Sequence, residues 1–199
     1  ALAASLPDET PAQKAVRVAR MEREYRFAGA VSTSVGTLAA IPVDLYPNVV
    51  ERLRGTPARL EEKLSKVPEK ILTRRQEETW TITENVGHLG MVELLWAARV
   101  DDFLAGRDEL TPADMEKSTR MNKEARFNDQ PIDKLLADFR QKRENLVTRV
   151  ENLDREMFAR TAHHPRLDMP MRFVDSLYFG AEHDDHHLAR ITELIFILA

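Results

Sequence analysis

Apolar residues recur at the spacing of an α-helix over four long segments of the chain, and this repeat restricts the fold more than any other feature. We expect these helices over about residues 44–67, 81–105 and 131–153, and over a last stretch that follows Pro170. Strand-like alternation and a glycine-rich phosphate loop are both absent from the sequence. The sequence therefore predicts an all-α fold, an antiparallel four-helix bundle, in which each helix buries one apolar stripe.

Local signals predict where these helices start, break and end. Thr81 followed by Glu84 forms a capping box at the start of the second helix. Thr56 before Pro57 has the pattern of an N-cap with proline at the first helical position, so we expect a kink or a restart inside the first helix. Residues 107–130 are charged and poor in large apolar side chains, which predicts a long loop, with a loop that contains a helical turn as the alternative. Residues 162–170 are expected to form the last loop.

We expect one domain over residues 43–199, because this length can bury a sizeable core. Residues 1–42 precede it as an N-terminal extension, which should pack on the domain or on a neighbouring subunit. The net charge of −4 offers no attraction for nucleic acid or an anionic membrane surface, and no apolar run is long enough to span a membrane. The opening residues lack the features of a signal peptide, so the cytoplasm is the expected location.

Cysteine is absent from the sequence. Disulfides, thiolate metal ligands and a cysteine nucleophile are thereby excluded together. A metal ion would have to be bound by nitrogen and oxygen, and chemistry on a thiol would need a thiol supplied by a small molecule.

Five of the six histidines fall between residues 163 and 187. On the last helix His183 and His187 lie one turn apart at the edge of the apolar stripe, whereas His186 should point towards water. This is the arrangement of two metal ligands beside an exposed histidine that does not bind the metal. The alternative is a histidine-rich helix flank with no ligand role, and we expect none for His163 and His164 in the loop.

The sixth histidine, His88, lies at the edge of the apolar stripe of the second helix. Ligand and metal sites in helix bundles are built from side chains on facing helices. One histidine from the second helix and two from the fourth, His183 and His187, therefore indicate a shared site.

Three stretches resemble the DinB/YfiT-like family in the order and spacing of their residues. Residues 80–96, with His88 in the middle, are similar to the second helix of that family. Residues 164–167, with the sequence His-Pro-Arg-Leu, resemble its final loop, and residues 181–188 resemble its fourth helix. The resemblance covers about residues 44–196.

This resemblance implies an up-down-down-up bundle, commonly a homodimer, with one divalent metal ion on three histidines. The ligands that it implies in this chain are His88, His183 and His187. Three neutral imidazoles leave the ion at least one open coordination position, as in catalytic rather than structural zinc sites. Zinc or nickel is the expected metal, and iron or manganese is the alternative.

The family includes thiol transferases, thiol-dependent isomerases and amide-cleaving hydrolases, so several functions stay open for this chain. We expect first an enzyme that transfers a low-molecular-weight thiol to an electrophilic small molecule. One alternative is a metal-dependent hydrolase of amide or ester bonds, with Glu93, Asp184 or His186 as its base. The other is a metal-binding stress-response module without catalysis.

Glu93 and Asp184 are the candidate catalytic or orienting carboxylates. Glu93 lies inward one turn beyond His88, and Asp184 lies inward between His183 and His187. We expect at least one of them to accept a hydrogen bond from a ligand imidazole or from a metal-bound water. The alternative is that both carboxylates only join helices through hydrogen bonds.

Overall fold

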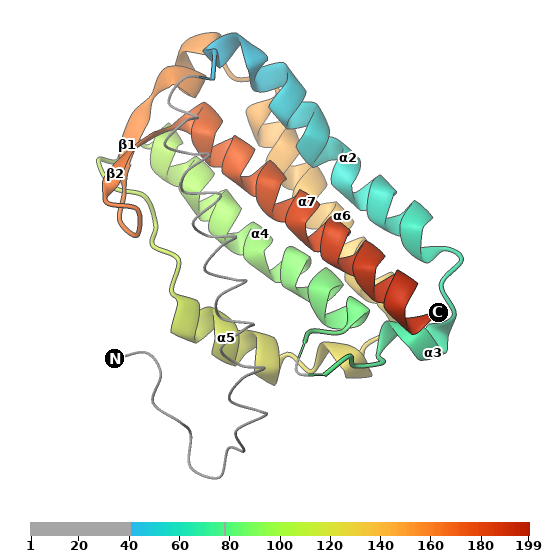
Figure 1. Cartoon of the computed structure of the whole chain (residues 1–199). Coiled ribbons are helices and arrows are strands. Elements are labelled where there is room, and N and C mark those ends of the chain that lie inside the picture. Colours follow the sequence, from blue (N-terminus) through green and yellow to red (C-terminus); the bar gives the residue numbers. More distant parts are fainter. Residues whose placement is uncertain (1–40, 78) are drawn as a thin grey trace.

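The structure, a computed structural model, describes residues 41–77 and 79–199. The four long helices in Figure 1 are α2 (Tyr46–Leu64), α4 (Ile82–Leu104), α6 (Ile132–Val150) and α7 (Phe173–Leu198). The shorter elements are η1 (Val43–Leu45), α3 (Glu69–Leu72), α5 (Met115–Glu124), η2 (Phe127–Asp129), η3 (Arg155–Ala159), β1 (Thr161–His164) and β2 (Met169–Arg172). The expected extension lies, except for its last two residues, outside the described part of the chain.

The predicted all-α four-helix bundle is confirmed, and its helices are arranged up-down-down-up. Helices α2 and α7 run in one direction and α4 and α6 in the other, and each of the four packs against two others (Figure 1). Because α4 and α6 are parallel neighbours, the chain between them must return along the bundle, a distance of about 29 Å for a 19-residue helix. This requirement explains the long connection over residues 105–131.

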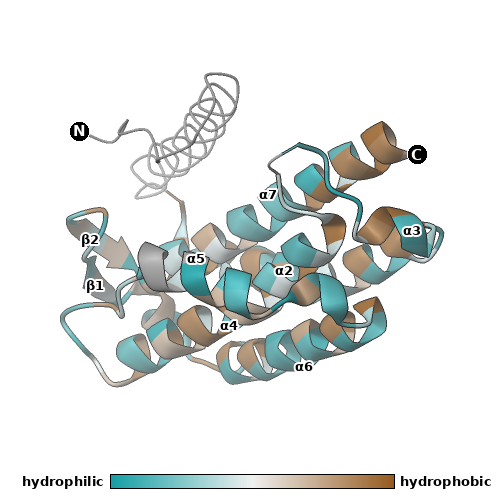
Figure 2. Cartoon of the chain, turned by 90° about the horizontal axis from the view of Figure 1, so that it is seen from below, coloured by the Kyte–Doolittle hydropathy of each residue, from teal (hydrophilic) through white to brown (hydrophobic). Residues whose placement is uncertain are grey.

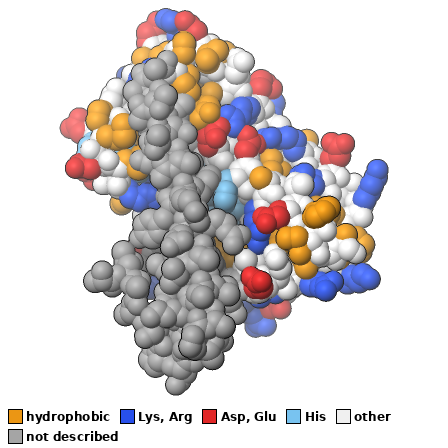
Figure 3. All heavy atoms as spheres, in the orientation of Figure 1, with side chains coloured by type: hydrophobic (Ala, Val, Ile, Leu, Met, Phe, Trp, Pro, Cys, Tyr) orange, Lys and Arg blue, Asp and Glu red, His pale blue; other side chains and the backbone are white. Residues whose placement is uncertain are grey.

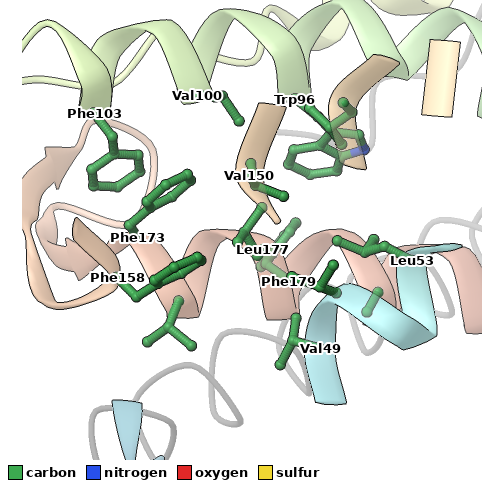
Figure 4. Close-up of a cluster of buried hydrophobic side chains, with 14 of the residues drawn as sticks. Val49, Leu53, Trp96, Val100, Phe103, Val150, Phe158, Phe173, Leu177 and Phe179 are labelled. Atoms are coloured by element: carbon green, nitrogen blue, oxygen red, sulfur yellow. The ribbon is translucent and has the colours of Figure 1, made fainter. Parts of the chain in front are cut away.

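Apolar side chains fill the bundle in two separate clusters. One contains Phe103 and Phe173 at the hairpin end (Figure 4), and the other contains Leu89 and Phe139 further along the bundle. Figure 2 shows hydrophilic residues on the outer sides of the helices. Between the two clusters, each of the four helices contributes one buried polar residue to what we call the polar layer: Thr56, Glu93, Arg143 and Asp184.

The expected restart at Thr56 and Pro57 is wrong, because α2 continues through both residues. Proline has no N–H to donate to the carbonyl four residues earlier, which here belongs to Leu53. The guanidinium of Arg143 on α6 donates to that carbonyl instead, with Nη1 2.9 Å from the oxygen. The helix therefore continues because a side chain from a neighbouring helix replaces the missing donor.

The capping box at the start of α4 is confirmed, with Thr81 and Glu84 in reciprocal hydrogen bonds. The expected last loop is instead an antiparallel hairpin of β1 and β2. Within the long connection, ten residues form α5, where we had expected a loop. No helix of the described residues is both long and apolar enough to cross a membrane.

Candidate metal centre

Three histidines from two antiparallel helices meet at the level of the polar layer. His88 comes from the second turn of α4, and His183 and His187 come from successive turns of α7. One ring nitrogen from each lies within 4.8 Å of the other two, and Nε2 of His88 is 3.2 Å from Nε2 of His183. Zinc bonds of 2.0–2.1 Å in tetrahedral geometry place two nitrogens about 3.3 Å apart. The spacing fits a divalent cation, so this group is a candidate divalent-metal site.

Burial keeps these imidazoles neutral. His88 is 8% exposed and His187 is 6% exposed. Burial lowers the pKa of His88 to about 4, and it also holds the pKa values of His183 and His187 well below the ordinary value of 6.5. Metal ions bind the neutral imidazole. At neutral pH protons therefore do not compete with a metal ion for these ring nitrogens.

Asn85, which the sequence analysis missed, orients the ring of His187. Its Nδ2 donates to the carbonyl of Thr81 at 2.8 Å, which leaves its Oδ1 as the acceptor that faces His187 Nδ1 at 2.8 Å. The ring proton of the neutral imidazole is therefore on Nδ1, and Nε2 keeps its lone pair for a ligand. Asn85 precedes His88 by three residues, so its inward position was visible in the helical pattern.

The long connection brings a second asparagine to the site. The ring of Phe127 packs on Gly87, where an added Cβ would lie 2.3 Å from that ring, and this close approach anchors the connection beside α4. Asn122 of α5 then lies with its amide nitrogen 3.2 Å from Nδ1 of His88, while its buried Oδ1 finds no partner in the described part of the chain. Rotating the amide by 180° would let Oδ1 accept a proton from His88 Nδ1 and free Nε2 for a ligand.

Two tryptophans border the site. The ring centroid of Trp80 is 4.8 Å from that of His88 and 6.0 Å from that of His187. Trp96 packs edge-on against His183, with the centroids 5.9 Å apart. On the face shown in Figure 3, histidine reaches the surface between hydrophobic and charged side chains. The site thus has aromatic walls, and His183 within it is partly exposed.

Glu93 and Asp184 are buried as expected, but their hydrogen bonds do not go to the imidazoles. Both carboxylates are bound by the guanidinium of Arg143, which donates to both oxygens of each. Asp184 also accepts from the hydroxyl of Thr56 at 2.8 Å. These contacts match the alternative that the carboxylates join helices. Arg143, which binds them both, is itself buried, with 1% of its surface exposed.

The remaining histidines lie outside the three-histidine group. His186 is half-buried, and its ring centroid is 5.2 Å from that of His187. His163 in β1 is half-buried, with Nε2 3.1 Å from Oδ1 of Asp168. His164, which we expected in a loop, is fully buried in β1.

Comparison with known proteins agrees with the resemblance found in the sequence. The model of the DinB superfamily matches residues 52–191. The solved structure of YfiT from Bacillus subtilis, described as a probable metal-dependent hydrolase with an unusual four-helix bundle topology, superimposes with a TM-score of 0.68. It is 20% identical, and the match covers 78% of this chain and 88% of that one. No curated protein sequence matches the chain. Since the family match spans well over half of its length, the chain belongs to the DinB superfamily.

Proposed function

We propose that the protein is a metal-dependent enzyme in which His88, His183 and His187 bind one divalent cation. The observation that carries this proposal is the approach of three neutral imidazoles to within 4.8 Å of one another, with one nitrogen pair 3.2 Å apart, close to the separation in a tetrahedral site. Zinc or nickel is the preferred metal, with iron or manganese as the alternative. When bound, such a cation supplies positive charge and open coordination positions that lower the pKa of a thiol or a water.

The reaction that we propose is transfer of a low-molecular-weight thiol to an electrophilic small molecule. The protein has no cysteine, so the thiol must come from a cosubstrate. Glu93 and Asp184 are both bound to Arg143, and neither is positioned by these contacts to take a proton from a substrate. Thiol transfer fits this arrangement because it needs no basic residue of the protein.

A second candidate is hydrolysis of an amide or ester. The likeness to YfiT, described as a probable metal-dependent hydrolase, favours it. Hydrolysis needs a base near the site, and His186, half-buried beside His187, is the candidate base that is not bound to Arg143. In the thiol reaction His186 would not be needed, so its replacement separates the two candidates.

Metal analysis of the purified protein tests the site. Single changes of His88, His183 and His187 to Ala should each abolish stoichiometric metal binding, whereas the matched control His163→Ala should retain it. The control is chosen because the His163 side chain is 40% exposed and belongs to the hairpin. Stoichiometric metal in all three variants would reject the proposed ligands.

Activity assays then test the reaction. Panels of low-molecular-weight thiols with electrophiles, and panels of amides and esters, are compared with and without added metal. Metal-dependent turnover of the first panel supports thiol transfer, and turnover of the second, lost in His186→Asn, supports hydrolysis. If neither panel is turned over by the metal-loaded protein, the proposal gives way to a metal-binding stress-response module.

We also propose, on the family resemblance, that the protein is a cytoplasmic homodimer. Light scattering at several protein concentrations measures the assembly, with a mass of twice 22.8 kDa expected. Cell fractionation checks the location.

A further inference from the structure

Arg99 and His164 each have a buried nitrogen without a hydrogen-bond partner in the described part of the chain, as does the nearby Trp96. Arg99 on α4 is 2% exposed and His164 on β1 is fully buried. Nη2 of Arg99 and Nε2 of His164 have no hydrogen-bond partner among the residues that the structure describes. Buried polar atoms are nearly always paired in native proteins, so two unpaired atoms on residues that interact electrostatically with each other indicate a ligand.

Both atoms are hydrogen-bond donors. A guanidinium has no acceptor. For His164 the tautomer follows from its other nitrogen, since the backbone N–H of Leu167 donates to Nδ1 at 3.2 Å. A neutral ring that accepts at Nδ1 carries its proton on Nε2. Burial, helped by the charges of Arg99 and Arg166, lowers the pKa of His164 to about 4, so the ring is neutral at pH 7.

The local charge is positive. Asp102, whose charge acts on Arg99, is bound by the backbone N–H of Thr111 at 2.6 Å and by Arg107 at 3.3 Å. Burial lowers the pKa of Arg99 to about 10, with Arg166 adding to the effect, so Arg99 is still charged at neutral pH. A buried charge without a hydrogen-bonded counter-ion is costly. The missing partner is therefore expected to be an anion.

The backbone holds these donors in place. Nε of Arg99 donates to the carbonyl of Thr111 at 3.2 Å. The segment before Thr111 pairs with β1, where His163 N donates to Asp108 O at 2.7 Å and Leu110 N donates to His163 O at 2.9 Å. His164 is thus fixed beside α4 before any ligand binds, which reduces the entropic cost of binding.

Aromatic rings connect the two donors to the three-histidine site. The guanidinium carbon of Arg99 lies 5.5 Å from the ring of Trp96, and that ring is 5.9 Å from His183. Phe179, seen with Trp96 in Figure 4, has its ring 5.9 Å from Trp96 and 6.4 Å from His164. Arg99 and His164 are thus joined to His183 by a continuous series of aromatic contacts through Trp96.

We propose that Arg99 and His164 form an anion-binding subsite beside the candidate metal centre, and that the substrate or its thiol cosubstrate carries a carboxylate that binds there. A carboxylate has two acceptor oxygens, one for each donor, and its negative charge neutralises the guanidinium. A water molecule can accept hydrogen bonds from the donors, but it has no charge that would neutralise the guanidinium. The link to a substrate rests on the proposed function. Binding of a carboxylate does not, because neither Arg99 nor His164 belongs to the three-histidine group.

The probe is acetate, with acetamide as a neutral control of nearly the same shape. Nuclear magnetic resonance of ¹⁵N-labelled protein follows the indole N–H of Trp96, assigned with the variant Trp80→Phe because the chain has two tryptophans. Acetate should shift this resonance saturably and acetamide should not. Arg99→Gln should weaken acetate binding about 10- to 100-fold, and Arg99→Lys, which keeps the charge without the planar fork, should weaken it less.

Two controls keep the result interpretable. His164→Phe, which leaves Arg99 intact, should also weaken acetate binding, and thermal unfolding shows which variants are folded. His88→Ala removes a proposed metal ligand and should still bind acetate, which would show that the subsite does not depend on the metal centre. The proposal is overturned if acetate gives no saturable shift, if acetamide acts equally, if the folded Arg99 variants bind acetate like the unaltered protein, or if His88→Ala abolishes binding.

Discussion

Replacing Arg143 with Met should destabilise the protein more than any other single change in the polar layer. The variant removes the cation that binds both buried carboxylates, Glu93 and Asp184, and the donor that compensates for Pro57 at the Leu53 carbonyl. Removing one partner of a buried ion pair costs about 3–5 kcal/mol. An unpaired buried carbonyl costs about 1–3 kcal/mol more, although the two effects need not add. A loss of at least 3 kcal/mol is therefore expected, a large part of the 5–15 kcal/mol typical of a folded domain.

The matched control is Arg140→Met, one turn earlier on α6. Arg140 makes a bidentate ion pair with Glu61 on α2, but its side chain is 36% exposed. Exposed pairs contribute about 0–1 kcal/mol, because water screens them. The two variants thus remove the same residue type, from the same helix, in different dielectric surroundings.

Urea unfolding followed by circular dichroism measures both variants at pH 5 and pH 7. Burial raises the pKa of Glu93 and the charge of Arg143 opposes this effect, so without Arg143 the folded-state pKa of Glu93 lies further above its unfolded value. Such groups stabilise the fold below the unfolded pKa and lose that contribution as the pH rises through the folded pKa. Arg143→Met should therefore be less destabilised at pH 5 than at pH 7. A loss below 1 kcal/mol at pH 7, or equal losses for the two variants, would refute the reasoning.

Three further changes test other contacts. Asn85→Ala should lower metal affinity about 10- to 100-fold in titrations, against an exposed control, Asn145→Ala, with no change. Burial raises the pKa of Glu93 above its ordinary value of 4.5, so the stability of the unaltered protein should fall relative to Glu93→Gln as the pH rises above 4.5, measured by urea midpoints. Pro57→Ala restores an N–H for the Leu53 carbonyl and should raise the unfolding free energy by up to about 3 kcal/mol; a lower urea midpoint would contradict this.

The bundle and the three histidines could be predicted because both follow from spacing within single helices. A repeat of 3.6 residues places side chains on one face, which identified four apolar stripes and separated His183 and His187 from the other histidines. A helical wheel also gives inward-facing polar residues. Asn85 could have been found in this way, because it lies among apolar residues of α4 and three residues before His88.

Contacts between distant segments could not be predicted from one sequence. Arg143 lies on the apolar stripe of α6, four residues after Phe139, so a helical wheel could have placed it inside the bundle. Its partners could not be predicted, because it is separated from Asp184 by 41 residues and from Leu53 by 90. Pro57 was misinterpreted for the same reason, since its missing N–H is compensated from another helix. The hairpin escaped detection because its strands have four residues each, too short for an alternating pattern to stand out.

The polar layer and the candidate metal centre depend on each other through α7. Asp184 lies between His183 and His187 in the sequence, about 100° from the first around the helix and about 60° from the second. Arg143 and Thr56 hold Asp184 from two other helices, so they fix the rotation of α7 about its axis. A purely apolar layer would tolerate a small rotation or slide of α7, and either movement would separate its two histidines from His88. The buried ion pairs thus cost desolvation energy but fix the helix register on which a three-histidine site depends.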